Sequence, residues 1–261
     1  MKNIEIDHGK PFDWGRASRE YARYRDIYPP AFYERILGLG LCQKGQKVLD
    51  LGTGTGVLPR NLYPWGAEFT GVDISENQIA QAERLTQEAG MKIAYQVSPG
   101  EELDFPEETF DVVTACQCFQ YFDRQRLFPE LHRVLKPEGR FCILFMAWLP
   151  EESPIAAKTE ELVLRYNPSW TGAHMTRALP EIPEESKGLF DVEERFGFDL
   201  DIPFTRETWN GRIRACRGIG ASSLPEEEIA RFEEEHRAFL AAVPEPFTIS
   251  HFATVLLLRK K

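Results

Sequence analysis

Segments with strand character and segments with helix character alternate from about Gln46 to Trp148, and no other feature limits the possible folds as much. The strand-like runs are short, apolar and bounded by turn residues, which is typical of buried parallel strands. These runs are Lys47–Leu51, Glu68–Val72, Lys92–Val97, Asp111–Cys118 and Arg140–Trp148. The helix-like segments between them are Val57–Tyr63, Ser75–Ala89 and Arg124–Leu135. Such alternation predicts right-handed crossovers and a doubly wound α/β sheet.

Local signals refine some boundaries. Ser75 and Gln78 have capping-box spacing, and Gly90 supplies a C-terminal stop for the helix between them. The run 136–139, Lys-Pro-Glu-Gly, predicts a turn before the fifth strand. Outside the alternating region, the chain up to about Gly40 is expected to be helical. The other expected elements are helices at Pro154–Tyr166 and Pro225–Ala242 and strands at Phe196–Phe204 and Phe252–Leu258. His236 lies on the apolar face of the later helix, which favours a packing role.

Composition excludes several classes of protein. A length of 261 residues suits one large domain, and a net charge of −10 disfavours a nucleic-acid partner and a membrane surface. The N-terminus lacks the apolar core of a secretory signal, so we expect a cytoplasmic protein. Five scattered cysteines do not form a disulfide framework. Cys116 and Cys118 form a C-x-C pair without further ligands, so buried thiols are favoured over a metal site.

A glycine-rich loop follows the first strand. Gly52, Gly54 and Gly56 form G-x-G-x-G, whereas the third glycine of the dinucleotide fingerprint would fall on Val57. The loop also lacks the G-K-[ST] ending of a P-loop. A tight turn with no ligand remains an alternative. Asp50 before the loop and Asp73 at the end of the next strand favour a ligand, because a carboxylate at Asp73 can accept hydrogen bonds from both hydroxyls of a ribose.

The chain contains four motifs in this order: "VLDLGTGTG", "GVDIS", "SPGEELDFPEETFDVVTACQCFQYFD" and "RVLKPEGRF". Together these motifs resemble class I S-adenosylmethionine-dependent methyltransferases, and the resemblance covers roughly residues 12–150. The N-terminal "YARYRDIYPPAFYERI" and "CQCFQYFD" resemble the small-molecule branch that includes trans-aconitate methyltransferases. The resemblance implies a Rossmann-like sheet of seven strands, mostly parallel with the last strand antiparallel, plus helical cap elements at both ends of the chain.

The resemblance also implies which residues serve the cofactor, S-adenosyl-L-methionine, and it implies no metal. The expected cofactor-binding residues are Tyr21, Arg25, Asp50, Gly52, Thr53, Gly54, Gly56, Asp73, Ile74, Gln78, Gly100, Glu101, Cys116 and Gln117. Tyr21, Gln120 and Tyr121 are expected to position the acceptor. Pro99 stands where the family usually has an acid, so recognition of adenine is expected through the backbone at Gly100 and Glu101.

These inferences give an expected organisation and activity. Residues 1–40 are expected to cap the cofactor, residues 41–150 to bind it, and residues 151–261 to supply substrate-side helices and the final strands of the same domain. The expected activity is methyl transfer to a small molecule by a monomer or homodimer, with a carboxylate-bearing acceptor as the hypothesis. One of two arginine groups would bind the carboxylate of the acceptor. In an acidic protein, however, arginines more often form ion pairs with surface carboxylates. The groups are Arg16, Arg19, Arg23 and Arg25, and Arg212, Arg214 and Arg217.

Three alternatives remain open from the sequence. An NAD-linked oxidoreductase would share the sheet and the ribose acid. A non-catalytic module could bind S-adenosylmethionine and regulate a partner. A nucleic-acid methyltransferase is disfavoured by the acidic charge.

Overall fold

The computed structural model describes residues 6–261, so the first five residues of the expected N-terminal cap lie outside the described residues. The chain divides into two compact units. Unit 1 comprises Met1–Ile27, Ala147–Arg177 and Asp199–Phe252. Unit 2 comprises Tyr28–Met146, Ala178–Phe198 and Ala253–Lys261.

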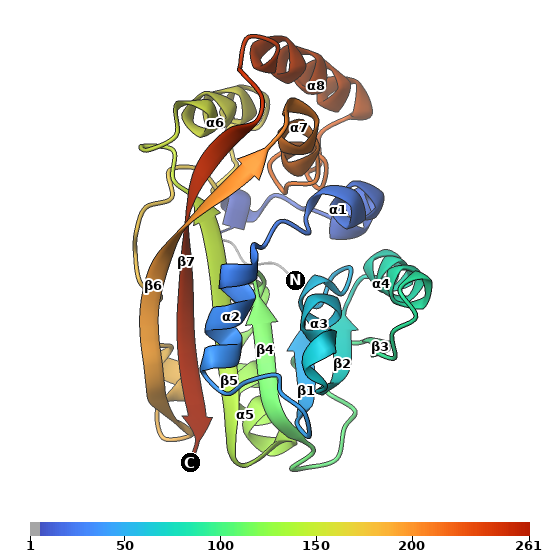
Figure 1. The fold of residues 1–261 in the computed structure, drawn as a ribbon, viewed down its shortest axis with the longest axis vertical. Helices are drawn as coiled ribbons and strands as arrows, with labels where there is room; N and C mark the ends of the chain where they lie inside the picture. Colours follow the sequence, from blue (N-terminus) through green and yellow to red (C-terminus); the bar gives the residue numbers. More distant parts are fainter. Residues whose placement is uncertain (1–5) are drawn as a thin grey trace. The chain divides into compact units, whose positions relative to one another are not determined.

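A seven-stranded sheet, most of whose residues belong to unit 2, has the strand order β3-β2-β1-β4-β5-β7-β6. The strands are β1 (Lys47–Leu51), β2 (Glu68–Asp73), β3 (Ala94–Val97), β4 (Phe110–Cys116), β5 (Leu135–Trp148), β6 (Phe190–Phe204) and β7 (Phe247–Lys260). The pairs β1–β2, β1–β4, β2–β3 and β4–β5 are parallel. The last strand, β7, runs antiparallel to the others (Figure 1). The predicted fold class is therefore confirmed.

Helices flank this sheet because each presents one apolar stripe to it. In unit 2 they are α2 (Pro30–Gly38), α3 (Val57–Leu62), α4 (Glu76–Glu88) and α5 (Arg124–Val134). Leu127, Leu131 and Val134 of α5 repeat at helical spacing and are fully buried against β1, β4 and β5. Short 3-10 turns lie at η3 (Tyr63–Trp65), η4 (Phe119–Tyr121) and η5 (Glu184–Ser186).

The predicted helix caps of α4 are present. The Ser75 side chain accepts a hydrogen bond from the Gln78 backbone N–H, and Gly90 takes a left-handed conformation with φ of 65° after the helix. These two signals made the bounds of α4 readable from the sequence.

The predicted turn at residues 136–139 is wrong, because these residues belong to β5. Phe110 of β4 pairs with Leu135, but Val112 pairs with Arg140, so the register shifts between the two pairs. The extra residues bulge out of the strand, and Glu138 takes a positive φ of 61°. Bulges and turns favour the same types of residue, such as glycine, so the sequence alone did not distinguish a bulge from a turn here.

Unit 1 is mainly helical. It contains η1 (Ile6–Gly9), η2 (Trp14–Ala17), α1 (Ser18–Tyr24), α6 (Pro154–Tyr166), α7 (Arg206–Arg214) and α8 (Glu226–Leu240). Helix α7 was not predicted, because most of its residues are polar and only Trp209 and Ile213 supply large apolar side chains to its buried face. Its capping box, Thr205 with Thr208, was the available signal. His236 of α8 is fully buried, which confirms its predicted packing position.

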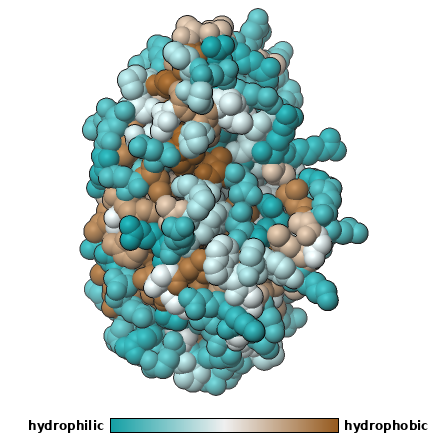
Figure 2. Space-filling view, in the orientation of Figure 1, coloured by the Kyte–Doolittle hydropathy of each residue, from teal (hydrophilic) through white to brown (hydrophobic). Residues whose placement is uncertain are grey.

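The surface has the mixed character expected of a chain with 28% charged residues. The face in Figure 2 is mostly hydrophilic, with apolar side chains in separate patches. Among residues 6–261, none of the helices has both the length and the apolar character needed to cross a membrane.

Candidate cofactor site

The glycine loop lies where the strand order of the sheet reverses. The chain builds β1, β2 and β3 outward in one direction and then returns to place β4 on the other side of β1. Ligands of open α/β sheets bind at the carboxyl ends of the strands at such a switch point. The loop 52–56 directly follows β1, so its position alone makes it the first candidate site.

The loop needs glycine for two separate reasons. Gly52, Gly54 and Gly56 have φ values of 55°, 56° and 73°, in the left-handed region that favours glycine. A Cβ on Gly52 would lie 2.8 Å from Cys118 Sγ, and a Cβ on Gly56 would lie 2.3 Å from Tyr95 Oη. The loop is therefore packed closely on its neighbours, with its backbone and not side chains available to a ligand.

The packing of Gly56 gives a stability prediction. Gly56→Ala should lower the free energy of unfolding by about 2–3 kcal/mol, because it combines a left-handed alanine with a clash. Urea denaturation would measure this loss. Tyr95→Phe removes the oxygen nearest the new methyl, so the double variant should lose less than the two single losses added together. Strictly additive losses would contradict the proposed contact.

Asp73 is held in place at the end of β2 by two backbone donors. Its Oδ2 accepts from the Gly54 N–H at 2.9 Å, and its Oδ1 accepts from the Ser75 N–H at 2.9 Å. Burial raises the pKa of this carboxyl, and the backbone hydrogen bonds oppose that rise. Each carboxylate oxygen keeps a second lone pair, so the group can accept two more hydrogen bonds from a diol. These hydrogen bonds connect the glycine loop to Asp73, the acidic residue that is expected to bind the ribose.

Asp50 is more deeply buried, with 2% of its surface exposed. Its Oδ1 accepts from Thr114 Oγ1 at 2.6 Å, which joins β1 to β4 at a register pair. Burial raises the pKa of Asp50 to about 6. The group therefore changes charge within the range of ordinary buffers, and a nearby cation would favour its ionised form.

Two large apolar side chains are exposed beside Asp73. Ile74 follows it and is 59% exposed, and Val97 at the end of β3 is 46% exposed. Val97 pairs with Asp73 in the sheet, so the two residues are direct neighbours. Exposed apolar side chains next to a fixed carboxylate suit a ligand that has an aromatic ring and a ribose. Val97 was missed from the sequence, because a strand end alone does not show which side chains remain exposed.

The end of β4 carries the residues expected at the methionine end of the cofactor. Gln117 has a positive φ of 66°, and its Nε2 donates to the Met146 carbonyl at 2.6 Å. Gln120 Nε2 donates to the Gln117 carbonyl at 3.1 Å, and Tyr121 completes η4. Cys116 Sγ donates to Tyr28 Oη at 3.6 Å. These residues form one turn directly after a central strand.

Gly100, Glu101 and Gln78 lie near the ends of β3 and α4. A Cβ on Gly100 would lie 2.8 Å from the Phe122 ring, so the position needs glycine. Glu101 is 7% exposed, and its carboxylate accepts from the Asp123 N–H at 2.8 Å, which fixes the start of α5. Gln78 is 2% exposed. The side chain of Glu101 thus has a structural partner, while the backbone of this loop remains the expected contact with adenine.

The remaining sequence-predicted residues, Tyr21 and Arg25, belong to unit 1. Tyr21 packs edge-on against Trp14 with ring centroids 5.7 Å apart. The Arg25 guanidinium lies 4.8 Å from the centre of the Tyr21 ring. The fourteen other candidates belong to unit 2, where they lie within the last residues of β1, β2 and β4, in the loops that follow β1 to β4, or in α4.

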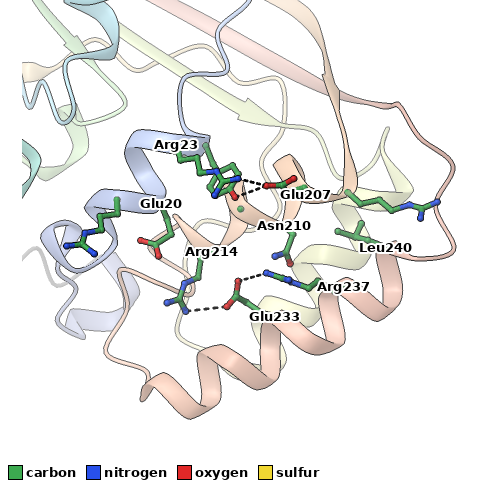
Figure 3. A pocket seen from close by; sticks show the side chains of 12 residues that line it. Glu20, Arg23, Glu207, Asn210, Arg214, Glu233, Arg237 and Leu240 are labelled. Atoms are coloured by element: carbon green, nitrogen blue, oxygen red, sulfur yellow. Dashed lines mark hydrogen bonds and ion pairs between the residues drawn. The ribbon is translucent and has the colours of Figure 1, made fainter. Parts of the chain in front are cut away.

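The seven arginines of the two groups fall into three sets: four that form ion pairs with acidic residues, Arg19, which lines a pocket, and Arg25 and Arg212, which have a different environment. A pocket of about 700 Å³ in unit 1 is lined by side chains from α1, α7 and α8 (Figure 3). In it Arg23 pairs with Glu207 at 2.7 Å and Arg214 with Glu233 at 3.8 Å. Arg16 pairs with Glu226 at 2.6 Å and Arg217 with Asp7. Arg16, Arg23 and Arg214 thus have the surface role considered from the sequence, whereas the ion pair between Arg217 and Asp7 is largely buried.

Comparison with known proteins agrees with this geometry. A family model described as a methyltransferase domain matches residues 49–143. Demethylmenaquinone methyltransferase of Thermus thermophilus is 35% identical over 191 residues, which are 72% of this chain and 70% of that protein. Methyltransferase phqN of Penicillium fellutanum is 40% identical over 107 residues, 39% of this chain, and the match covers only 32% of that protein's length.

A solved structure shows the same fold. It is a type II methyltransferase candidate from Anaeromyxobacter dehalogenans, with a TM-score of 0.57 at 20% identity over 90% of this chain and 97% of that one. Members of the matching family use S-adenosylmethionine as their methyl donor. The family match falls on the strands and loops that build the candidate site, and the Thermus relative extends the likeness over most of both chains. The chain therefore belongs to the class I S-adenosylmethionine-dependent methyltransferases.

Proposed function

We propose that this protein transfers a methyl group from S-adenosylmethionine to a small-molecule acceptor by in-line displacement. One observation carries the proposal. The Asp73 carboxylate is fixed by the Gly54 and Ser75 N–H groups at the switch point of the sheet, with the exposed Ile74 beside it. The carboxylate suits the ribose hydroxyls, Ile74 and Val97 suit the adenine, and the close-packed glycine loop suits a ligand without phosphate.

In this proposal each residue binds or orients a reactant. Asp50 supports the glycine loop and favours the ammonium group of the methionine part, and Cys116 and Gln117 border that part. When bound, S-adenosylmethionine supplies a methyl group on a sulfonium, which is a good leaving group. Gln120 and Tyr121 would place the acceptor in line and exclude water. Placement of this kind can contribute about 7–11 kcal/mol.

Two observations support a small-molecule acceptor: the name of a relative and the chemistry of methyl transfer. The Thermus relative is named for demethylmenaquinone, a small molecule. A carboxylate oxygen needs no base to accept a methyl group, because it is already ionised at neutral pH. A hydroxyl acceptor would have to lose its proton.

Calorimetry with S-adenosylhomocysteine tests the cofactor part of the proposal. We expect saturable binding in the micromolar range, and we expect NADH not to bind. NADH binding without S-adenosylhomocysteine binding would favour the oxidoreductase. Binding of S-adenosylhomocysteine without any methyl transfer would favour the regulatory module.

The pKa of Asp50 predicts how cofactor binding depends on pH. Because the ionised form attracts the ammonium group and the pKa is about 6, lowering the pH from 7.5 to 5 should raise the Kd of S-adenosylhomocysteine about tenfold. Calorimetry across this range would measure the change. In Asp50→Asn the dependence should be nearly flat, and an equally steep dependence in that variant would remove Asp50 from the ammonium site.

A further inference from the structure

Two arginines of unit 1, the buried Arg212 and the half-buried Arg25, differ from the surface pairs. Arg212 of α7 is 4% exposed, and its Nη1 donates to Cys216 Sγ at 2.9 Å. Arg25 Nη1 donates to the same sulfur at 3.8 Å. The Arg212 guanidinium also lies 5.1 Å from the centre of the Trp148 ring. Two guanidinium groups therefore meet at one sulfur beside an aromatic face.

The ring of Trp148 is fixed by a buried acid. Its Nε1 donates to Glu160 Oε1 at 2.6 Å, and Glu160 is 1% exposed. Trp148 is the last residue of β5, so this cluster begins at the carboxyl end of a central strand. Ligands of open α/β sheets bind at that end of the strands.

His251 of β7 adds an unused polar atom. Leu149, next to Trp148, donates its N–H to the Ser250 carbonyl at 2.8 Å, which brings this part of β7 to the end of β5. His251 is 1% exposed, and its Nδ1 lies 2.8 Å from the Ile249 carbonyl oxygen. A carbonyl only accepts, so Nδ1 carries the proton. Nε2 is buried and has no hydrogen-bond partner among residues 6–261.

The ring of His251 is neutral, so Nε2 is an acceptor. Burial, with a smaller effect from the positive charges of Arg212 and Arg25, lowers the pKa of His251 to about 3. Phe204 stacks on the His251 ring with centroids 6.2 Å apart and packs edge-on against Trp209 at 4.9 Å, which places His251 beside α7, the helix that carries Arg212. A buried acceptor without a donor is costly, and a ligand hydroxyl would satisfy it. Arginine forks in turn bind carboxylates well.

We propose that Arg25, Arg212 and His251 recognise a small hydroxy acid, whose carboxylate binds the guanidinium groups and whose hydroxyl donates to His251 Nε2. Given the proposed methyl transfer, this molecule is the acceptor or a close analogue of it. Because the site would bind a hydroxyl as well as a carboxylate, it restricts the expected acceptor from small molecules in general to hydroxy acids.

Calorimetry on the full chain tests the site with two matched pairs of probes. The pairs are mandelate with phenylacetate and 3-hydroxybenzoate with benzoate, so each pair differs by one hydroxyl. We expect at least one hydroxy acid to bind with a Kd of about 1 mM or lower and about tenfold more tightly than its partner. Each titration is run with and without S-adenosylhomocysteine. Failure of S-adenosylhomocysteine to bind overturns the proposed function, whereas its binding without any hydroxy acid overturns this site.

Variants test separately which residue binds the hydroxyl and which binds the carboxylate. His251→Asn keeps a donor to the Ile249 carbonyl but removes the Nε2 position, so it should abolish the advantage of the hydroxyl. His251→Gln places an oxygen near that position and should retain it. Arg212→Gln should weaken the binding of every carboxylate probe by about tenfold or more. Arg214→Gln, on the same helix, should leave the binding of these probes unchanged. A hydroxyl advantage that survives His251→Asn, or unchanged binding in Arg212→Gln, overturns the proposal.

Discussion

Replacing Asp73 by alanine is expected to weaken binding of S-adenosylhomocysteine by about 100-fold or more. The carboxylate is proposed to accept hydrogen bonds from both ribose hydroxyls, and bonds to a charged group contribute about 1.5–3 kcal/mol each. The variant also removes the acceptor of the Gly54 and Ser75 N–H groups, which frees the glycine loop from β2. Isothermal titration calorimetry at neutral pH measures the change directly.

Two further variants control this experiment. Asp73→Asn keeps one acceptor oxygen and should give an intermediate loss of about tenfold. Glu102→Ala removes an exposed carboxylate that pairs with Arg126 and should leave binding unchanged. An unchanged affinity in a folded Asp73→Ala protein would remove Asp73 from the cofactor site.

Acid is expected to destabilise unit 1 through two buried histidines. Burial lowers the pKa of His236 to about 4 and that of His251 to about 3, both below the value of about 6.5 in the unfolded chain. A lowered pKa means that the stability is fully present above pH 6.5 and is lost as the pH falls toward the folded values. Between pH 7.5 and 4.5 the two groups together should cost about 5 kcal/mol of unfolding free energy.

Urea denaturation at several pH values measures this loss, and a variant isolates one contribution. His236→Asn removes the titrating ring while retaining polar atoms near Asn210. Its stability at pH 7.5 should be lower than that of the wild type, but its loss down to pH 4.5 should be smaller by about 2–3 kcal/mol. Asp50 contributes with the opposite sign, because its pKa is raised, and the difference between the two proteins cancels that contribution. Identical acid sensitivity in both proteins would contradict a buried neutral His236.

The sequence predicted the sheet well because its signals were local. Apolar runs, Gly90 and the Ser75 cap define β1, β2 and α4 without reference to the rest of the chain. The turn expected at 136–139 was wrong because a bulge inside a long strand has the same composition as a turn. Helix α7 was missed because its polar residues conceal the buried face of Trp209.

The residues at the strand ends and in the loops of the candidate site could be predicted from the sequence, but the burial and exposure of its other side chains could not. Asp50 and Asp73 could be selected because each stands at a strand end next to the glycine loop. The exposure of Val97 and the unpartnered Nε2 of His251 depend on contacts between distant segments, which no local pattern encodes. The same holds for the arginines, since only the fold separates Arg212 from the surface pairs of Arg23 and Arg214.

Transfer of an isotopically labelled methyl group from S-adenosylmethionine into a metabolite extract tests the central claim most directly. Products are separated by size and identified by mass. We expect label in a small molecule heavier by one methyl group, formed together with S-adenosylhomocysteine and strongly reduced with Asp73→Ala. Label found only in protein or nucleic acid, or no label despite cofactor binding, would contradict it.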